Sequence, residues 1–236
     1  YTDVDGVYTT DPRQYKKAKK IKKISYEEML EMASQGAKVL QTRSVALAMK
    51  YKLKIKVLSS FENKEGTLVL HEDEIMEKKN VSGIAFSLDE AKLTVIGIPD
   101  KPGQASILFK SLGLKAINVD MIVQNVGSDG LADFTFTVSR NSLNKAVKVI
   151  EKHKKSMGYQ NIEYKRNIVK VSLVGVGMRS HAGIASKMFK CLAKNQVNIR
   201  MISTSEIKIS VVIDQKNLEI AVQALHNEFK LEKKNK

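Results

Sequence analysis

The chain has 236 residues, enough for one to three domains, and its 43% hydrophobic and 28% charged residues are typical of a globular protein. It contains no apolar run long enough to cross a membrane, the polar residues after Tyr1 exclude a signal peptide, and Cys191, the only cysteine, excludes an intrachain disulfide. The 40 basic and 25 acidic residues give a net charge of +15, but the lysines are dispersed and no aromatic residues alternate with them as stacking platforms. We therefore expect a cytoplasmic protein without a membrane or nucleic-acid partner.

The chain opens with a polar stretch, YTDVDGVYTTDPR, whose side chains suit a nucleotide site. Aspartates such as Asp3 can accept hydrogen bonds from a ribose or a purine amine, Tyr8 can stack on a base, and the planar guanidinium of Arg13 can hold phosphate. The DVDG sequence lacks the remaining ligands of a calcium loop, so we expect no metal site here. On composition alone, an ordinary surface loop is the alternative interpretation.

A capped helix and two strands are predicted next. Ser25 and Glu28 have the spacing of a capping box, which predicts a helix that begins there and ends at Gly36. The segments KIKVLSSF at 54–61 and GTLVL at 66–70 are predicted to be strands.

Two copies of one pattern fill the second half of the chain. Residues 91–122 and 169–202 align with a two-residue insertion in the second copy. The matched pairs are Lys92 with Lys170, Gly97 with Gly175, Gly103 with Gly183, Ala105 with Ala185, Ser106 with Ser186, Phe109 with Phe189, Lys110 with Lys190, Asn118 with Asn198, and Met121 with Met201. Two copies predict two similar domains, since a solenoid needs three or more repeats.

Each copy shows the same order of signals, β-α-β-β-α-β, which is typical of a ferredoxin-like fold with helices on an antiparallel sheet. In the first copy the predicted elements are a strand around Leu93–Gly97, a helix with its apolar side at 107–114, strands at 118–126 and 132–139, a helix capped by Asn141 or Ser142, and a short strand at 161–165. The pattern predicts an α+β fold class.

The second copy ends before its fourth strand. After a predicted helix at 218–229 only KLEKKNK remains, which is too charged for a core strand. The segment VSGIAFS at 81–87 precedes the first copy, and we expect it to complete the second copy's sheet. The first domain, 88–166, is then inserted within the second, which consists of 81–87 and 167–236.

The loop between the first strand and helix of the first copy has the features of an amino-acid pocket. Glycine there leaves backbone N–H groups free at a helix N-terminus, which favours a carboxylate. Asp100, Asn118 and Asp120 are acceptors for an ammonium group, so PDKPGQAS with INVDMIVQN predicts an amino-acid site, although an ordinary turn also explains the first motif. Gly175 and Gly177 imitate part of a dinucleotide fingerprint, but hairpin signals follow them instead of a βαβ unit.

These motifs together resemble one enzyme family. IGIPDKPG, INVDMIVQN, GVGMRSHAG, VNIRMISTSEI and ALHNEF are similar to the paired ACT domains of aspartokinases, and YTDVDGVYTTDPR with ISYEEMLEMASQGAKVL resembles the C-terminal part of their α/β amino-acid-kinase domain. The resemblance implies that L-aspartate is phosphorylated by ATP with Mg²⁺ to 4-phospho-L-aspartate, under feedback control by lysine, threonine or both. It also implies that effectors bind between ACT domains of two subunits in a homodimer or higher oligomer.

The resemblance assigns site residues by position. It implies ATP contacts at Thr2, Asp3, Tyr8, Arg13 and Lys38. It implies effector contacts at Asp100, Gly103, Ala105, Asn118, Asp120 and Gln124 in the first ACT domain, and at Asn198, Ile199, Ser205 and Glu206 in the second. Gly127, Ala185 and Arg200 differ from the residues of several members, which leaves the identity of the effector open.

The resemblance also divides the chain. Residues 1–72 would be the end of the catalytic domain, 73–80 a linker, and 59–80 the segment that couples effector binding to the kinase. The family's N-terminal lysine-glycine motif and acidic loops are absent, so we expect no catalytic residues here, no activity from these residues alone, and a larger parent enzyme. One alternative is a non-catalytic regulatory subunit, for which Met76 would be a suitable start. The other is a nucleic-acid binder, whose binding would weaken steeply with salt.

Overall fold

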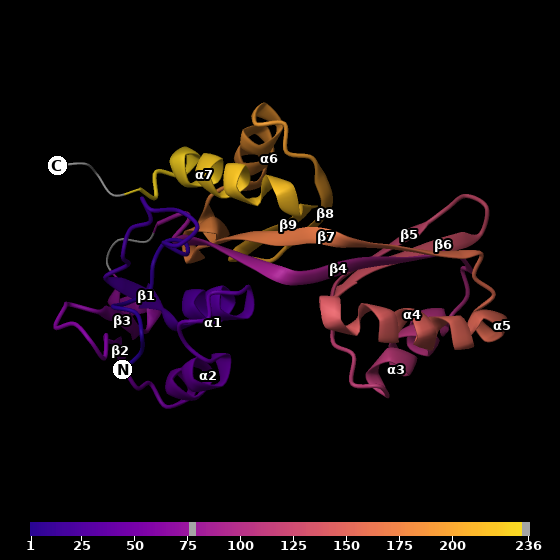
Figure 1. Ribbon diagram of the computed structural model, residues 1–236, viewed down its shortest axis with the longest axis horizontal. Coiled ribbons are helices and arrows are strands. Elements are labelled where there is room, and N and C mark those ends of the chain that lie inside the picture. Colours follow the sequence, from indigo (N-terminus) through magenta and orange to yellow (C-terminus); the bar gives the residue numbers. More distant parts are fainter. Residues whose placement is uncertain (76–78, 233–236) are drawn as a thin grey trace. The chain divides into compact units, whose positions relative to one another are not determined.

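The computed structural model describes residues 1–75 and 79–232 (Figure 1), so Met76 lies outside the described residues. The chain divides into two compact units. The outer unit consists of Tyr1–Ser87 and Lys170–Lys236, and the inner unit of Leu88–Val169. Every helix in the described part of the chain falls short of the length and apolarity that a membrane crossing requires.

The first part of the outer unit is a three-stranded sheet with two helices. The strand order is β1-β3-β2, with β1 parallel and β2 antiparallel to β3. The elements are β1 (Lys23–Ser25), α1 (Tyr26–Ser34), α2 (Thr42–Lys50), β2 (Ile55–Val57), β3 (Thr67–Leu70) and the 3-10 turn η1 (Glu72–Glu74). The strand predicted at 54–61 is therefore only three residues long.

Helix α1 begins as its capping box predicts. The Glu28 N–H donates to the Ser25 hydroxyl at 3.1 Å, and the Ser25 N–H donates to the Glu28 carboxylate at 3.2 Å. Beyond the C-cap residue Gln35, Gly36 has φ +118°, which other residues rarely adopt. A Cβ at Gly36 would also lie 2.1 Å from the Phe86 carbonyl oxygen. Glycine is therefore required where this helix ends.

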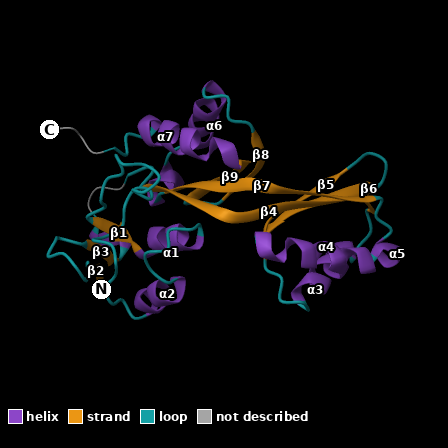
Figure 2. Cartoon of the chain, in the orientation of Figure 1, coloured by secondary structure: helices purple, strands orange, loops and turns teal. Residues whose placement is uncertain are grey.

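The inner unit has the predicted β-α-β-β-α-β order, and its sheet has the order β5-β6-β4-β7. Its elements are β4 (Gly83–Pro99, the part from Leu88 on), α3 (Gln104–Gly113), β5 (Val119–Val126), β6 (Leu131–Val138), η2 (Arg140–Ser142), α4 (Leu143–Lys152), α5 (Lys154–Met157) and β7 (Asn161–Val174, the part up to Val169). Figure 2 shows α3 and α4 on one face of this sheet. The predicted α+β class is confirmed.

The core of the inner unit is built from alternate strand residues and one side of each helix. Leu93 and Val95 of β4 are fully buried, as expected for residues two apart on one face of a sheet. Phe109 of α3 packs against Phe136 of β6 with ring centroids 5.4 Å apart. Ser142 occupies the N-cap position of α4, as one of the two predicted residues, but its backbone is already helical because η2 runs directly into α4, and its side chain caps no N–H group in the described chain.

The second copy of the repeat completes the outer unit. Its sheet has the order β4-β7-β9-β8, to which β4 contributes residues up to Ser87 and β7 residues from Lys170 on. The other elements are η3 (Val176–Ser180), α6 (Ile184–Lys194), β8 (Ile199–Thr204), β9 (Lys208–Asp214), η4 (Gln215–Asn217) and α7 (Leu218–Glu228). Figure 1 shows α6 and α7 on one face of this sheet and α1 on the opposite face.

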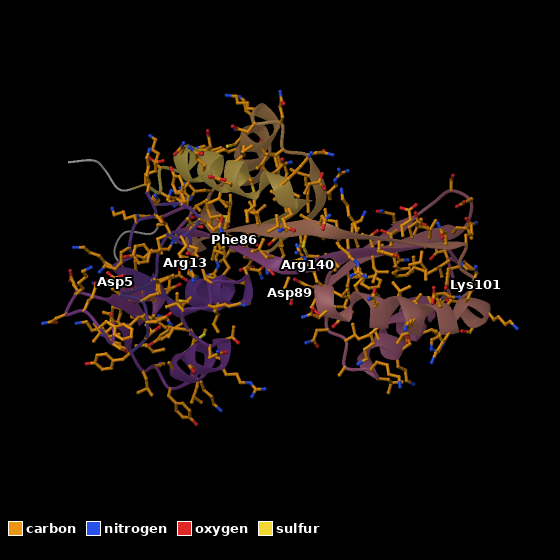
Figure 3. The ribbon with its side chains drawn as sticks, in the orientation of Figure 1. Asp5, Arg13, Phe86, Asp89, Lys101 and Arg140 are labelled. Carbon is orange, nitrogen blue, oxygen red and sulfur yellow. The ribbon has the colours of Figure 1, made fainter. Side chains whose placement is uncertain are left out.

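The strands β4 and β7 are longer than any predicted strand. Residues predicted as separate strands on either side of Asp89 belong to the single strand β4. Within the inner unit, Arg140 fastens the beginning of its β4 part to the end of its β7 part (Figure 3). The Arg140 N–H donates to Asp89 at 2.9 Å, and its guanidinium donates to the carbonyl oxygens of Glu90 at 3.2 Å and Ile168 at 2.8 Å.

Candidate functional site

A pocket of about 470 Å³ opens in the outer unit between the start of α6 and the turn that joins β8 to β9. Its lining residues are Met178, Arg179, His181, Gly183, Ile184, Ala185, Thr204, Ser205, Glu206 and Ile209. Because Gly183 and Ala185 align with Gly103 and Ala105 across the repeat, the pocket lies in the second copy where an amino-acid pocket was predicted in the first.

The start of α6 forms an electropositive side of this pocket. Gly183 holds the N-cap position with φ +91°, and among the described residues no side chain caps the helix. The first N–H groups of a helix have no intrahelical partner, and the helix dipole adds a partial positive charge. Ile184 and Ala185, the first two residues of α6, both line the pocket. This side therefore favours an anion such as a carboxylate.

Arg179 and Glu206 bring opposite charges to the same pocket. Arg179 Nη1 lies 3.1 Å from Glu72 Oε2, and Arg179 Nε lies 3.4 Å from Glu206 Oε2. The Glu72 side chain is 16% exposed and that of Glu206 is 82% exposed, so water screens the second pair more. His181 Nδ1 lies 2.9 Å from the Gly177 carbonyl oxygen, which orients the ring. An accessible carboxylate near an electropositive helix start suits a zwitterionic ligand.

The effector residues predicted in the second copy fall into two pairs. Ser205 and Glu206 line the pocket, and the turn that holds them is closed by a hydrogen bond from the Ser205 N–H to the Lys208 carbonyl at 2.8 Å. Asn198 and Ile199 lie at the opposite end of β8. A six-residue strand spans roughly 20 Å, so one chain does not bring the two pairs to the same small molecule.

The residues predicted in the first copy lie on two segments of the inner unit. They are all exposed: Asp100, Gly103 and Ala105 around the start of α3, and Asn118, Asp120 and Gln124 on or just before the edge strand β5. Gly103 is the N-cap of α3 with φ +97°, the same conformation as Gly183. The two copies therefore begin their first helices in the same way.

Thr2, Asp3 and Arg13 are predicted ATP residues that take part in short-range hydrogen bonds of the N-terminal segment. The Thr2 hydroxyl donates to Asp3 at 3.0 Å, and the Arg13 guanidinium donates to Asp11 at 2.9 Å. The bond to Asp11, together with the nearby charge of Asp3, raises the pKa of Arg13. The Arg13 side chain is 88% exposed (Figure 3), so the guanidinium remains accessible to a ligand.

Tyr8 and Lys38, the other predicted ATP residues, have different surroundings. The Tyr8 hydroxyl donates to Asp5 at 2.8 Å, and burial with this bond raises the pKa of Tyr8 to about 12. Lys20 Nζ also lies 3.2 Å from Asp5 Oδ2, so the Asp5 carboxylate contacts both Tyr8 and Lys20. Lys38 is exposed in the turn after α1.

Comparison with known proteins covers both parts of the chain. The ACT domain model matches residues 93–153 and 171–229, and the amino acid kinase family model matches residues 1–59. Aspartate kinase Ask_LysC of Stutzerimonas stutzeri (strain A1501) is 57% identical over 98% of this chain and 57% of that protein. A chain in the crystal structure of aspartokinase alpha and beta subunits is 45% identical, with a TM-score of 0.61, over 64% of this chain and 99% of that one. The chain belongs to the aspartokinase family.

Among solved aspartokinases, the E. coli aspartokinase III complex with lysine and aspartate has a TM-score of 0.79 and 26% identity, over 97% of this chain and 51% of that one. The complex of the same enzyme with aspartate and ADP has a TM-score of 0.80 and 25% identity, again over 97% and 51%. The chain spans about 57% of the length of the curated aspartate kinase that it matches. The kinase-family match covers the first part of the outer unit, and the two ACT matches cover the inner unit and the second copy.

Sequence reasoning missed most of the pocket in this aspartokinase chain. Arg179 and His181 were not singled out, although both lie in MRSHAG, between strand and helix. The signal was available, because MRSHAG occupies the same place in the second copy as PDKPGQA in the first. Carrying the predicted pocket across the repeat from Gly103 to Gly183 would have found these residues.

Proposed function

We propose that the protein carrying this chain is an aspartokinase that transfers a phosphoryl group from ATP to L-aspartate, giving 4-phospho-L-aspartate, in the cytoplasm. The observation that carries the proposal is the 57% identity to an aspartate kinase over 98% of the chain, which includes both the kinase-like and the ACT parts. Because the chain spans 57% of that relative, we keep the prediction that these 236 residues do not catalyse the transfer alone.

We propose that Thr2, Asp3, Tyr8, Arg13 and Lys38 contribute to the ATP site. The exposed cations of Arg13 and Lys38 suit phosphate, and Arg13 would exchange its contact with Asp11 for a phosphate oxygen. The described residues contain no group of three or more His, Cys, Asp or Glu that could hold a metal ion. Mg²⁺ bound with ATP would neutralise charge on the phosphates.

We propose that lysine, threonine or both bind in the pocket at the start of α6. The amino acid's carboxylate would accept hydrogen bonds from the first N–H groups of α6, and its ammonium group would pair with Glu206. E. coli aspartokinase III, whose fold this chain shares, was solved with lysine. The predicted residues of the first copy would form an equivalent site on the inner unit.

Feedback control would follow from a population shift. An effector that binds one arrangement of the ACT domains more tightly can shift the kinase only by that difference in affinity. Glu72 lies in the 59–80 segment predicted to carry this coupling, and its contact with the pocket residue Arg179 supports that role. Assembly through the edge strands β5 and β8 would complete the sites, since Ile122 and Ile202 are 53% and 44% exposed there.

Thermal unfolding of the chain with lysine, threonine and methionine tests the effector site. A ligand at about one hundred times its Kd adds roughly 2.7 kcal/mol to the free energy of unfolding, so lysine or threonine should raise the melting temperature and methionine should not.

Glu206→Gln should weaken the binding of that effector at least about tenfold, because hydrogen bonds to charged groups contribute about 1.5–3 kcal/mol. Glu219→Gln, on the exposed side of α7, is the matched control and should bind normally. Equal binding by both variants would contradict the assignment.

The second candidate is a separate regulatory subunit of an aspartokinase. The match over 99% of a chain from the alpha and beta subunit structure favours it, whereas the kinase-family match at 1–59 favours the enzyme itself. Trapping aspartyl phosphate with hydroxylamine distinguishes the two. Activity of the complete gene product alone supports the enzyme, and effector binding without activity supports the subunit.

A further inference from the structure

Helix α1, in the part that matches the amino acid kinase family, turns one polar face toward the sheet of the second ACT domain. Glu28, Glu31 and Gln35 occupy this face, because residues three and four apart are neighbours on a helix surface. Glu28 and Gln35 are 3% and 5% exposed. Figure 1 shows α1 on the face of the sheet opposite α6 and α7.

Two of these side chains form buried hydrogen bonds with the ACT domain or the segment leading to it. Glu28 Oε1 accepts from the Val176 N–H at 3.0 Å and from the Ser82 hydroxyl at 2.6 Å. Gln35 Oε1 accepts from the Ser172 hydroxyl at 3.1 Å. Buried polar groups are costly to leave unpaired, so these contacts fix where α1 lies on the sheet.

The third side chain reaches β9. Lys208 Nζ lies 3.0 Å from Glu31 Oε2 as an ion pair without the alignment of a hydrogen bond, and the two side chains are only 20% and 27% exposed. Neighbouring residues on a strand point to opposite faces. Lys208 therefore faces α1, and Ile209 lines the pocket on the other face.

The same elements thus contact α1 and line the pocket. Val176 is the first residue of η3, which also carries the pocket residues Met178 and Arg179. A small displacement of η3 by a ligand would strain the bond from Val176 to Glu28. Packed interfaces respond to such displacements by moving between discrete arrangements.

We propose that Glu28, Glu31 and Gln35 are positioning residues that couple the pocket to α1, so that an amino acid bound at α6 changes the position of α1 in the kinase-like part. This inference rests on the proposed function, because it takes the pocket to be the effector site. The polar face of α1 is then a second route, beside the 59–80 segment, by which effector binding reaches the kinase-like part.

Linkage measures the coupling without relying on activity. In the complete gene product, calorimetry would give the Kd of L-lysine and of L-threonine with and without ADP and Mg²⁺. The ratio of the two Kd values is the coupling factor, typically about 5–150-fold. The double variant Glu31→Gln with Gln35→Ala should reduce this ratio at least about fivefold, toward one. Ser44→Ala, at an exposed position of α2 in the same kinase-like part, is the matched control and should keep the ratio.

A second variant and a second measurement test the inference independently, in case the double variant does not fold. Ser172→Ala removes the Gln35 contact from the ACT side and should also lower the ratio. In the unsubstituted protein, the effector should slow or speed amide hydrogen exchange within residues 26–34. The inference is overturned, although effector binding stands, by any one of three results. These are an unchanged Kd ratio in both variants, a Kd ratio of one in the unsubstituted protein, and unchanged amide exchange in α1. If neither amino acid binds, the proposed effector site fails and the inference fails with it.

Discussion

At the scale of single residues, one buried imidazole joins the second ACT domain to the N-terminal segment. His226 of α7 is fully buried, its Nε2 lies 2.9 Å from Thr9 Oγ1, and its ring lies 4.8 Å from that of Tyr15. Its Nδ1 is buried and has no hydrogen-bond partner among the described residues. Burial lowers the pKa of His226 to about 4, against the smaller opposing effect of the Glu232 charge. The imidazole is therefore neutral in the folded protein at neutral pH.

We expect this histidine to make the protein less stable in mild acid. The pKa of His226 is about 4 in the folded protein and 6.5 in the unfolded chain. As the pH falls, the unfolded chain therefore binds a proton before the folded protein does. The contribution of the neutral His226 to the free energy of unfolding is fully present above pH 6.5 and is lost as the pH falls toward 4. About 2 kcal/mol of it is lost by pH 5. Urea unfolding at pH 7 and pH 5 measures the loss. His226→Gln should show much less pH dependence, and His71→Gln, at an exposed histidine, should behave like the unsubstituted chain.

At the scale of elements, the 3-10 turn η3 is fitted against the segment before β4. A Cβ at Gly177 would lie 2.4 Å from the Lys79 carbonyl oxygen, and one at Gly175 would lie 2.4 Å from the Asn80 carbonyl oxygen. The two glycines that imitate a dinucleotide fingerprint thus serve close backbone packing. This packing places η3, and with it the pocket residue Arg179, against the 59–80 segment.

Gly177→Ala should therefore destabilise the protein. Overpacking of this kind costs about 1–3 kcal/mol, because the contact is with backbone, which cannot turn aside. Gly113→Ala is the control: it lies at the end of α3 with open space around it, so it should be neutral or stabilising by up to about 1 kcal/mol. The free energies of unfolding in urea compare the two variants. A loss no larger for Gly177→Ala than for Gly113→Ala would contradict this account.

The elements that the sequence could predict are those with a local signal. The Ser25 and Glu28 spacing predicted the start of α1, and alternation around Leu93 predicted a strand of the inner unit. The length of β4 could not be predicted, because polar residues such as Asp89 interrupt the apolar alternation where the strand continues. The contact of Arg179 with Glu72 could not be predicted either, because the two residues lie 107 positions apart along the chain and meet only through tertiary packing.

At the scale of the whole molecule, the inner unit has its own core and joined ends. Its core cluster runs from Ala91 to Tyr159 without residues of the outer unit. Arg140 bonds both the Glu90 and the Ile168 carbonyl groups, so the two ends of the unit lie close together. The core cluster of this domain is thus formed by residues of its own range.

We expect residues 88–169 to fold when expressed alone, and residues 170–236 to fail. The second segment lacks the strand that β4 supplies and the helix α1 that covers its polar face. Circular dichroism during thermal unfolding measures the difference: 88–169 should unfold cooperatively, whereas 170–236 should show no transition. A cooperative transition in 170–236 alone would show that β4 is dispensable for the second ACT domain.

The division of β4 between two units also has a consequence during synthesis. Residues 83–87 leave the ribosome before the whole inner unit, yet their partner strand begins its outer-unit part at Lys170. At about 5–20 residues per second, several seconds pass before that partner emerges. During this interval the inner unit can fold, while the start of β4 remains an unpaired strand edge of the kind that chaperones bind and that aggregates recruit. The yield of the folded protein thus depends on how quickly the ribosome continues past Val169.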